Sequence, residues 1–188
     1  NVSQTRQRIK FYLTLAALTL IIIAIARPQF GASTESVKRR GIEVMIALDV
    51  SNSMLAKDVS PSRLEMAKQM LSKLSESLSN DKVGVIVFAG EAQMQIPLTA
   101  DYVAAKMFLS SIEPGMISRQ GTAIGSAIDL GIQGLSTNEK TGKTIIVITD
   151  VENHEDNAID AAKLAAEKGI MVNVVGIGTP EGSPIPAA

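Results

Sequence analysis

The segment from Asp49 to Ser53 carries one carboxylate and two hydroxyl groups at alternate positions, in the order Asp-Val-Ser-Asn-Ser. It directly follows the apolar run 42–48, which is typical of a buried strand. Alternate side chains of an extended segment point to the same side, so Asp49, Ser51 and Ser53 can present their oxygen atoms together. Oxygen ligands are those that a hard cation such as Mg²⁺ prefers. The spacing therefore predicts part of a magnesium site.

Two more oxygen groups occur at matching places later in the chain. Thr122 stands at the start of an apolar-periodic helix pattern, and Asp150 directly follows the strand-like run 144–149. Two carboxylates and three neutral hydroxyls nearly balance a divalent ion and leave ligand positions open, which favours binding over catalysis. The predicted metal ligands are Asp49, Ser51, Ser53, Thr122 and Asp150. Mg²⁺ fits these ligands best, and Mn²⁺ or Ca²⁺ can substitute for it.

Strand-like and helix-like patterns alternate from residue 42 onward. The predicted strands are 42–48, 83–88, 92–98, 144–149 and 170–177, and the predicted helices are 61–78, 101–111, 122–135 and 156–168. Unbroken Val and Ile runs indicate strands that are buried on both faces. We therefore expect an α/β fold, a doubly wound, mainly parallel sheet with one antiparallel edge strand and helices on both faces. In such sheets the ligand crevice lies at the carboxyl ends of the strands, where all five oxygen groups fall.

The helix patterns also predict local details. Pro61 is expected at the first helical position with Ser60 as its cap, and Thr122 is expected to cap the helix that it starts. In the helix 101–111, the side chains expected to face inward are Val103, Ala104, Met107 and Phe108.

The beginning of the chain differs in composition from the rest. Arg6, Arg8 and Lys10 precede the uncharged, mostly apolar run 11–26, which Arg27 closes. The run is a little shorter than the roughly 20 residues that span a membrane, and the flanking basic side chains extend its reach. We predict a retained membrane helix; the alternatives are a cleaved signal peptide and a buried helix. The excess of basic residues before the run predicts that the domain after it faces outward.

The 188 residues are expected to hold one domain behind this anchor. The predicted segments are a basic flank (1–10), a transmembrane helix (11–27), a linker (28–41) and the domain (42–188). Because the first residue is Asn1, we expect the numbering to begin inside a longer protein. The net charge of −1 without a basic face argues against nucleic-acid binding, and the absence of cysteine excludes disulfides and zinc–thiolate sites.

These motifs together resemble a known family. Asp49-x-Ser51-x-Ser53, followed later by Thr122 and Asp150, is similar to the metal-ion-dependent adhesion site (MIDAS) of von Willebrand factor A-type domains. Further segments resemble the membrane-anchored bacterial Bat family of the aerotolerance operon: Ala26-Arg-Pro-Gln29, Leu48-Asp-Val-Ser-Asn-Ser-Met-Leu55, Ser60-Pro-Ser-Arg-Leu-Glu65, and Ile148-Thr-Asp150 with Glu152-Asn-His-Glu155. The resemblance covers nearly the whole chain. It departs at Val151, where such domains commonly have Gly, and at Ala188, before the family's last strand and helix, so we expect a C-terminally incomplete domain.

The resemblance implies a function and a cellular setting. Ser51, Ser53 and Thr122 would bind the ion directly, Asp49 and Asp150 directly or through water, and a Glu or Asp of a partner would complete the ligand shell. The implied partners are related A-type domain proteins, tetratricopeptide-repeat proteins and a MoxR-type AAA+ ATPase. The implied location is the bacterial inner membrane with a periplasmic domain. We therefore expect a membrane-anchored, metal-dependent protein-binding module that helps to assemble a cell-envelope complex.

Several loop residues near the predicted site have two interpretations each. Four apolar side chains either form a rim that contacts the partner or pack beneath the loops: Met54, Leu55, Met116 and Ile117. Asn52 is expected to brace the turn, and Glu152 can accept a hydrogen bond behind a metal ligand. Arg119 either steers an acidic partner or is a solvated loop residue, and His154 is expected to be exposed.

Enzymatic readings find little support in the sequence. The chain has no Gly-x-Ser-x-Gly elbow and no Walker A loop, and Gly176-x-Gly178 is followed by Thr179-Pro180 in place of a helix-opening Gly. A minority alternative is a phosphoesterase in which Mg²⁺ activates water, with His154 or Glu152 as the base. Another alternative is a structural scaffold, in which the ion only stabilises loops.

Overall fold

The computed structural model describes residues 4–26, 41–77, 81–138, 141–150, 157–179 and 184. The chain divides into two compact units, Asn1–Lys38 and Arg39–Ala188, and each is considered by itself.

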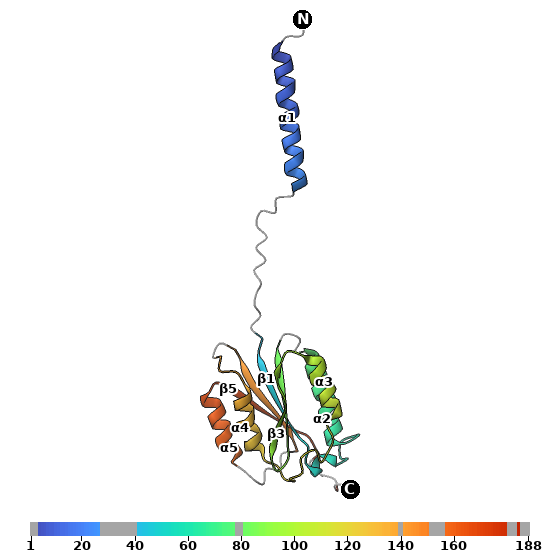
Figure 1. Ribbon diagram of the computed structural model, residues 1–188. Helices are drawn as coiled ribbons and strands as arrows, with labels where there is room; N and C mark the ends of the chain where they lie inside the picture. Colours follow the sequence, from blue (N-terminus) through green and yellow to red (C-terminus); the bar gives the residue numbers. More distant parts are fainter. Residues whose placement is uncertain are drawn as a thin grey trace. The chain divides into compact units, whose positions relative to one another are not determined.

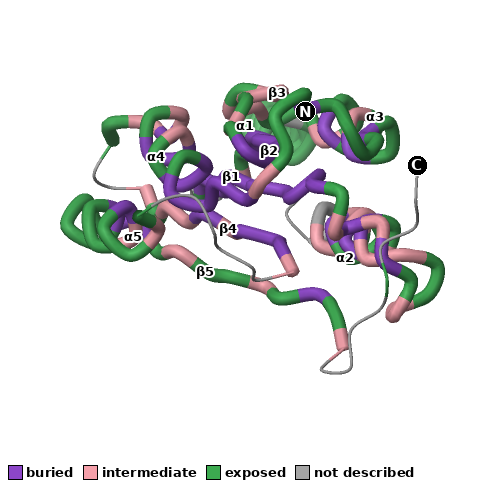
Figure 2. Tube along the Cα trace, turned by 90° about the horizontal axis from the view of Figure 1, so that it is seen from below, coloured by how far each residue is buried: buried purple, intermediate pink, exposed green. Residues whose placement is uncertain are grey.

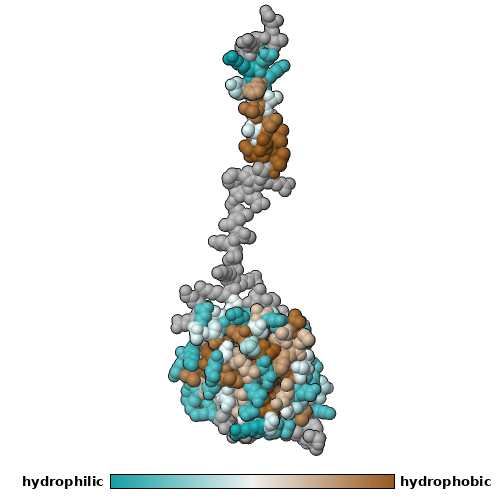
Figure 3. All heavy atoms as spheres, in the orientation of Figure 1, coloured by the Kyte–Doolittle hydropathy of each residue, from teal (hydrophilic) through white to brown (hydrophobic). Residues whose placement is uncertain are grey.

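The first unit contains one long helix, α1 (Gln4–Ala26). Its span from Arg6 to Ile25 is long and apolar enough to cross a membrane, and its apolar side chains are exposed over most of its length (Figure 3). The hydroxyls of Thr14 and Thr19 donate to carbonyl oxygens one turn earlier, at 2.8–3.0 Å. These bonds satisfy the polar atoms inside the helix, as a hydrocarbon environment requires. The helix begins before Arg6, so the three basic residues lie within its first turns.

The second unit is a five-stranded sheet in the order β3-β2-β1-β4-β5 (Figure 1). Its strands are β1 (Glu43–Asp49), β2 (Lys82–Phe88), β3 (Ala92–Thr99), β4 (Lys143–Thr149) and β5 (Ile170–Gly176). All neighbouring strands are parallel except β2 and β3, which pair antiparallel. The expected doubly wound α/β fold with one antiparallel edge strand is confirmed.

Helices cover both faces of this sheet (Figure 1). The helices are α2 (Arg63–Ser77), α3 (Tyr102–Ser111), α4 (Ile124–Gly134) and α5 (Ala158–Glu167), and a short 3₁₀ helix, η1 (Asn52–Leu55), follows β1. Val44, Ile46 and Leu48 of β1 join one core cluster with side chains of α2 and α3. Met45 and Ala47 join the other, with side chains of α4 and α5. All seven residues of β1 are buried (Figure 2), so the central strand anchors both halves of the core.

The structure corrects three predicted helix details. Helix α2 begins at Arg63 and not at Pro61, and the hydroxyl of Ser62 accepts the backbone N–H of Glu65 at 3.2 Å. Ser60-Pro61 is a cis peptide bond ahead of the helix. Thr122 does not cap α4, whose N-cap residue is Ala123. Thr122 lies one residue before the N-cap position, so its side chain does not cap the helix.

The inward face of α3 is also different from the prediction. Ala105 and Leu109 are buried, whereas Val103 and Met107 are 70% and 68% exposed, and Ala104 is exposed. Of the four predicted side chains, Phe108 does face inward, since it packs against the core cluster. In a ten-residue helix both stripes are apolar, so spacing alone does not tell which stripe contacts the sheet.

The central position of β1 gives a first prediction. Ile46 is 1% exposed and Ile159 of α5 is 70% exposed. We expect Ile46→Ala to lower the free energy of unfolding by about 2–5 kcal/mol, because it leaves a cavity in the core. The same substitution at Ile159 should change it by less than about 0.5 kcal/mol. Urea unfolding followed by circular dichroism measures both, and equal effects would contradict the assigned burial.

Candidate metal centre

The predicted metal ligands lie where the strand order reverses. The chain passes from β1 to β2 and β3 on one side, and later to β4 and β5 on the other, so the switch point lies between β1 and β4. Asp49 is the last residue of β1, and Asp150 directly follows β4. Because these neighbouring strands are parallel, their carboxyl ends bring the two carboxylates to one edge of the sheet. Ligands of open α/β sheets bind at this position.

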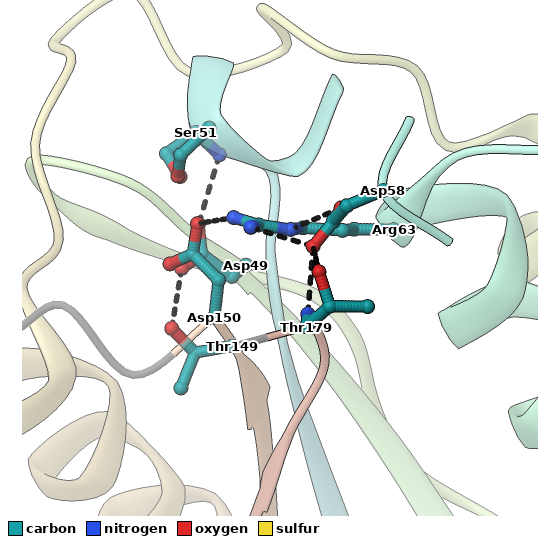
Figure 4. Close-up of polar contacts among 8 residues, drawn as sticks. Asp49, Ser51, Asp58, Arg63, Thr149, Asp150 and Thr179 are labelled. Carbon is teal, nitrogen blue, oxygen red and sulfur yellow. Dashed lines mark hydrogen bonds and ion pairs between the residues drawn. The ribbon is translucent and has the colours of Figure 1, made fainter. Parts of the chain in front are cut away.

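Asp49 is buried and held by two donors (Figure 4). Its Oδ1 accepts the backbone N–H of Ser51 at 2.9 Å, and its Oδ2 accepts the hydroxyl of Thr149 at 2.7 Å. Burial raises the pKa of the Asp49 carboxyl, and the negative charge of Asp150 adds to this, while the hydrogen bonds from Ser51 and Thr149 oppose it. These two hydrogen bonds fix the orientation of the Asp49 side chain. Both donors are neutral, so neither balances the negative charge of the carboxylate.

The two serines of the motif come together as predicted. Their Oγ atoms lie 2.9 Å apart; Ser51 is buried and Ser53 half-buried. The turn into η1 thus brings the hydroxyls of alternate residues to one place beside Asp49.

The two carboxylate oxygens of Asp150 differ in their contacts with the described residues. Its side chain is only 1% exposed. Oδ2 accepts a hydrogen bond from Nη1 of Arg63 at 2.8 Å. Oδ1 is buried and has no hydrogen-bond donor among the described residues. A buried anionic oxygen without a donor is costly, and a cation beside it would supply the missing interaction.

Arg63 joins Asp150 to a third carboxylate, that of Asp58 (Figure 4). Its Nε and Nη2 each donate to one oxygen of Asp58 at 2.9 Å. The backbone N–H of Thr179 donates to the same carboxylate at 2.7 Å. The hydrogen bond from Arg63, followed by that from Thr179, holds the pKa of Asp58 well below its usual range, and Asp58 in turn raises the pKa of Arg63. Arg63 and Asp58 are therefore both charged at neutral pH.

Backbone contacts bring Thr122 to the same edge. The side-chain oxygen of Gln120 accepts the backbone N–H of Asn52 at 3.2 Å, and the N–H of Ala123 donates to Ala89 at 2.7 Å. Gly90 permits this approach, because a Cβ there would lie 2.5 Å from the carbonyl oxygen of Gln120. Thr122 is 5% exposed, between two residues that are tied to the ends of β1 and β2.

The residues present fit a hard divalent ion. Within the described part of the chain, no three His, Cys, Asp or Glu side chains gather as a metal cluster, so the donors here are two carboxylates and hydroxyls. All five predicted ligands lie at the switch-point edge. Oxygen donors of this composition suit Mg²⁺, Mn²⁺ or Ca²⁺, and Oδ1 of Asp150 is an orphaned atom that such an ion would satisfy. The individual ligand roles remain predictions.

Sequence reasoning missed Arg63, Asp58 and Thr149. Arg63 and Thr149 stood inside the segments that carry the family resemblance, without an assigned role. A signal for Thr149 was available, since it precedes Asp150 at the end of a strand adjacent to β1. The spacing of Asp58 and Arg63 in the sequence does not predict their contact. They come together because the chain turns between them, before α2 begins.

The four apolar loop residues divide between their two interpretations. Met54 and Ile117 are fully buried and belong to the core, because η1 and the loop 112–121 fold these side chains beneath themselves. Leu55 is half-buried and Met116 is 41% exposed, so these two remain candidates for partner contact. Asn52 is exposed. Val151, Glu152 and His154 lie outside the described residues.

Comparisons with known proteins agree with the fold. A family model for the von Willebrand factor type A domain matches residues 44–153. The crystal structure of an aerotolerance-related membrane protein from Bacteroides fragilis is 59% identical, with a TM-score of 0.76, over 78% of this chain and 73% of that chain. The conserved hypothetical protein BatB from Bacteroides thetaiotaomicron is 62% identical, with the same TM-score, over 78% and 72%.

Curated relatives are more distant and longer. A UPF0353 protein of Nocardia farcinica is 32% identical over 186 residues, which cover 91% of this chain and 54% of that protein. The chain spans about half the length of the curated relatives that it matches. The match to the domain model and the identity to the Bacteroides structures lead to the same conclusion: the chain belongs to the von Willebrand factor type A domain family, among the Bat-type, aerotolerance-related membrane proteins.

Proposed function

We propose that this protein is a membrane-tethered binding module that docks an acidic side chain of a partner protein on a divalent ion, and so helps to assemble a cell-envelope complex. The observation that carries the proposal is the buried Oδ1 of Asp150, which has no hydrogen-bond partner in the described part of the chain. Asp49 and the paired hydroxyls of Ser51 and Ser53 lie at the same edge of the sheet. These atoms lie at the ligand-binding edge of the sheet.

The charge of the donor set favours binding a partner. Asp49 and Asp150 supply two negative charges, and Ser51, Ser53 and Thr122 supply neutral oxygens. When bound, the ion provides a Lewis-acidic centre with remaining positions for water or for a partner's carboxylate. Mg²⁺ is the preferred ion by this chemistry, with Mn²⁺ or Ca²⁺ as substitutes.

Structural neighbours support the proposal at the level of the fold. Proximal thread matrix protein 1 of the mussel byssus has a zinc-occupied MIDAS motif, and it shares this fold at 19% identity and a TM-score of 0.64. The Plasmodium vivax TRAP protein has a manganese-loaded structure, at 20% identity and a TM-score of 0.61. We extend divalent-ion binding to this chain on the chemistry of its own donors.

The surroundings of the site indicate the kind of partner. Leu55 and Met116 offer apolar contact near the site, and Arg119, an exposed residue of the neighbouring loop, suits an acidic partner. By family resemblance, the candidate partners are other A-type domain proteins, tetratricopeptide-repeat proteins and a MoxR-type AAA+ ATPase. We place the module at the bacterial inner membrane with a periplasmic domain, as the basic residues in the first turns of α1 predict.

Ion binding gives the first test. We expect isothermal titration calorimetry of the full chain in detergent to detect one Mn²⁺ or Mg²⁺ per chain. The double variant Ser51→Ala/Ser53→Ala should weaken binding by at least about tenfold, because it removes two ligands. The matched control is Ser110→Ala/Ser111→Ala, whose hydroxyls donate to carbonyls of α3, and it should bind as the wild type does. No ion uptake by the folded wild-type chain would refute the proposal.

Partner retention gives the second test. The full chain is pulled down from membranes with and without a chelator, beside Ser51→Ala/Ser53→Ala. We expect a set of envelope proteins that is retained only by the wild type with the ion present, because the docked carboxylate needs the cation. Proteins retained equally in all samples would favour the alternative of a structural scaffold.

Membrane attachment gives the third test. Leu18→Asp/Ile22→Asp places two carboxylates in the middle of α1, where each costs about 2.5–3.5 kcal/mol on insertion. We expect this variant to leave the carbonate-washed membrane fraction. Gln7→Asp, near the start of the helix, is the control and should remain with the membrane. Retention of the double variant would show that α1 is not the anchor.

A further inference from the structure

Arg63 holds two carboxylates at once. Nη1 donates to Oδ2 of Asp150 at 2.8 Å, while Nε and Nη2 donate to the two oxygens of Asp58 at 2.9 Å each. The guanidinium is planar and presents its donors in a fixed fork. The position of Asp150 therefore depends on where the fork is held.

Two further segments of the chain, one at Asp58 and one at residues 178–179, fix the fork in place. Asp58 is itself bound by the N–H and the hydroxyl of Thr179, at 2.7 and 3.3 Å. Gly178 packs against the guanidinium, since a Cβ there would be 3.2 Å from Nη2 of Arg63. The Arg63 side chain is 12% exposed and that of Asp58 is 2% exposed. The fork therefore has little freedom to leave Asp150.

The contact with Arg63 makes the two carboxylate oxygens of Asp150 unequal (Figure 4). Oδ2 is occupied by Arg63, and Oδ1 is buried without a described donor. Asp150 can thus offer a cation one oxygen, directly or through water. Ca²⁺ takes six to eight oxygen ligands and often binds both oxygens of a carboxylate, whereas Mg²⁺ keeps near-octahedral geometry with water in several positions.

We infer that Arg63 is a positioning residue that limits Asp150 to one oxygen donor, and that it thereby makes the site select small six-coordinate ions such as Mg²⁺ and Mn²⁺ over Ca²⁺. The inference rests on the proposed function, because it presupposes that an ion binds here. It adds a determinant of ion selectivity that lies outside the five predicted ligands.

The ratio of two ion affinities separates this role from a general electrostatic effect. Removing a positive charge attracts Mn²⁺ and Ca²⁺ alike, because both carry the same charge, so that effect cancels in the ratio. Releasing Oδ2 of Asp150 favours Ca²⁺ more, because Ca²⁺ can use the second oxygen. A residue that only stabilised the fold would leave the ratio unchanged.

The experiment measures the Kd of Mn²⁺ and of Ca²⁺ by calorimetry on the full chain in detergent. In Arg63→Met we expect the ratio of the Ca²⁺ Kd to the Mn²⁺ Kd to fall on the order of tenfold. Arg63→Lys is the second variant, in case Arg63→Met does not fold. Its ammonium keeps the charge but is a point donor that cannot span both carboxylates as the fork does, so the ratio should fall by a smaller factor.

Lys163→Met is the matched control, because Lys163 also pairs with an aspartate, Asp160 at 3.0 Å, but both side chains are exposed and neither contacts Asp150 in this pair. It should leave the ratio unchanged. If the wild type binds Mn²⁺ and the folded Arg63 variants keep its ratio, the inference is overturned while the proposed function stands. If the folded wild type binds neither ion, both are overturned.

Discussion

Three carboxylates and one guanidinium lie at the switch-point edge of this sheet, and the guanidinium of Arg63 pairs with only two of the three, Asp58 and Asp150. Asp49, Asp58 and Asp150 have nearly no solvent contact, and Arg63 is the cation that the described contacts provide. The hydroxyl of Thr149 and the N–H of Ser51 partly satisfy Asp49. One buried oxygen of Asp150 stays without a described donor. A divalent cation would offset the excess of negative charge, and the proposed ion site explains the arrangement in this way.

The fold creates this imbalance by bringing together strand ends that are distant in the chain. β1 and β4 are parallel neighbours, and residues 43–48 pair in register with 143–148. Two core clusters, one on each face of β1, fix that register, and a shift by one residue would exchange the buried faces. The hydrophobic core thus fixes the separation of Asp49 and Asp150. The favourable free energy of core packing offsets the electrostatic repulsion between these two neighbouring carboxylates.

The sequence predicted the features that depend on short spacing. The strand-like runs, their buried type and the alternate oxygens of Asp49, Ser51 and Ser53 are local patterns, and the fold class that follows from them is confirmed. Prediction from the sequence failed where a helix has two apolar stripes, because either stripe could be the buried one. Helix α3 has two such stripes, and only its contact with the sheet chose Ala105 and Leu109. Likewise Met54 is a loop residue by sequence and a core residue once η1 turns back onto the sheet.

By itself, the sequence determined a doubly wound α/β domain behind a long apolar helix, and it predicted five oxygen groups near one sheet edge. The tertiary structure alone decided how Asp150 is used, because its partner Arg63 lies 87 positions away in the chain. Thr179, which holds Asp58 in place, lies 121 positions from it. Periodicity reports only which side a residue faces within its own element. The fork between Asp58 and Asp150 exists because packing brings the ends of separate elements within hydrogen-bonding distance.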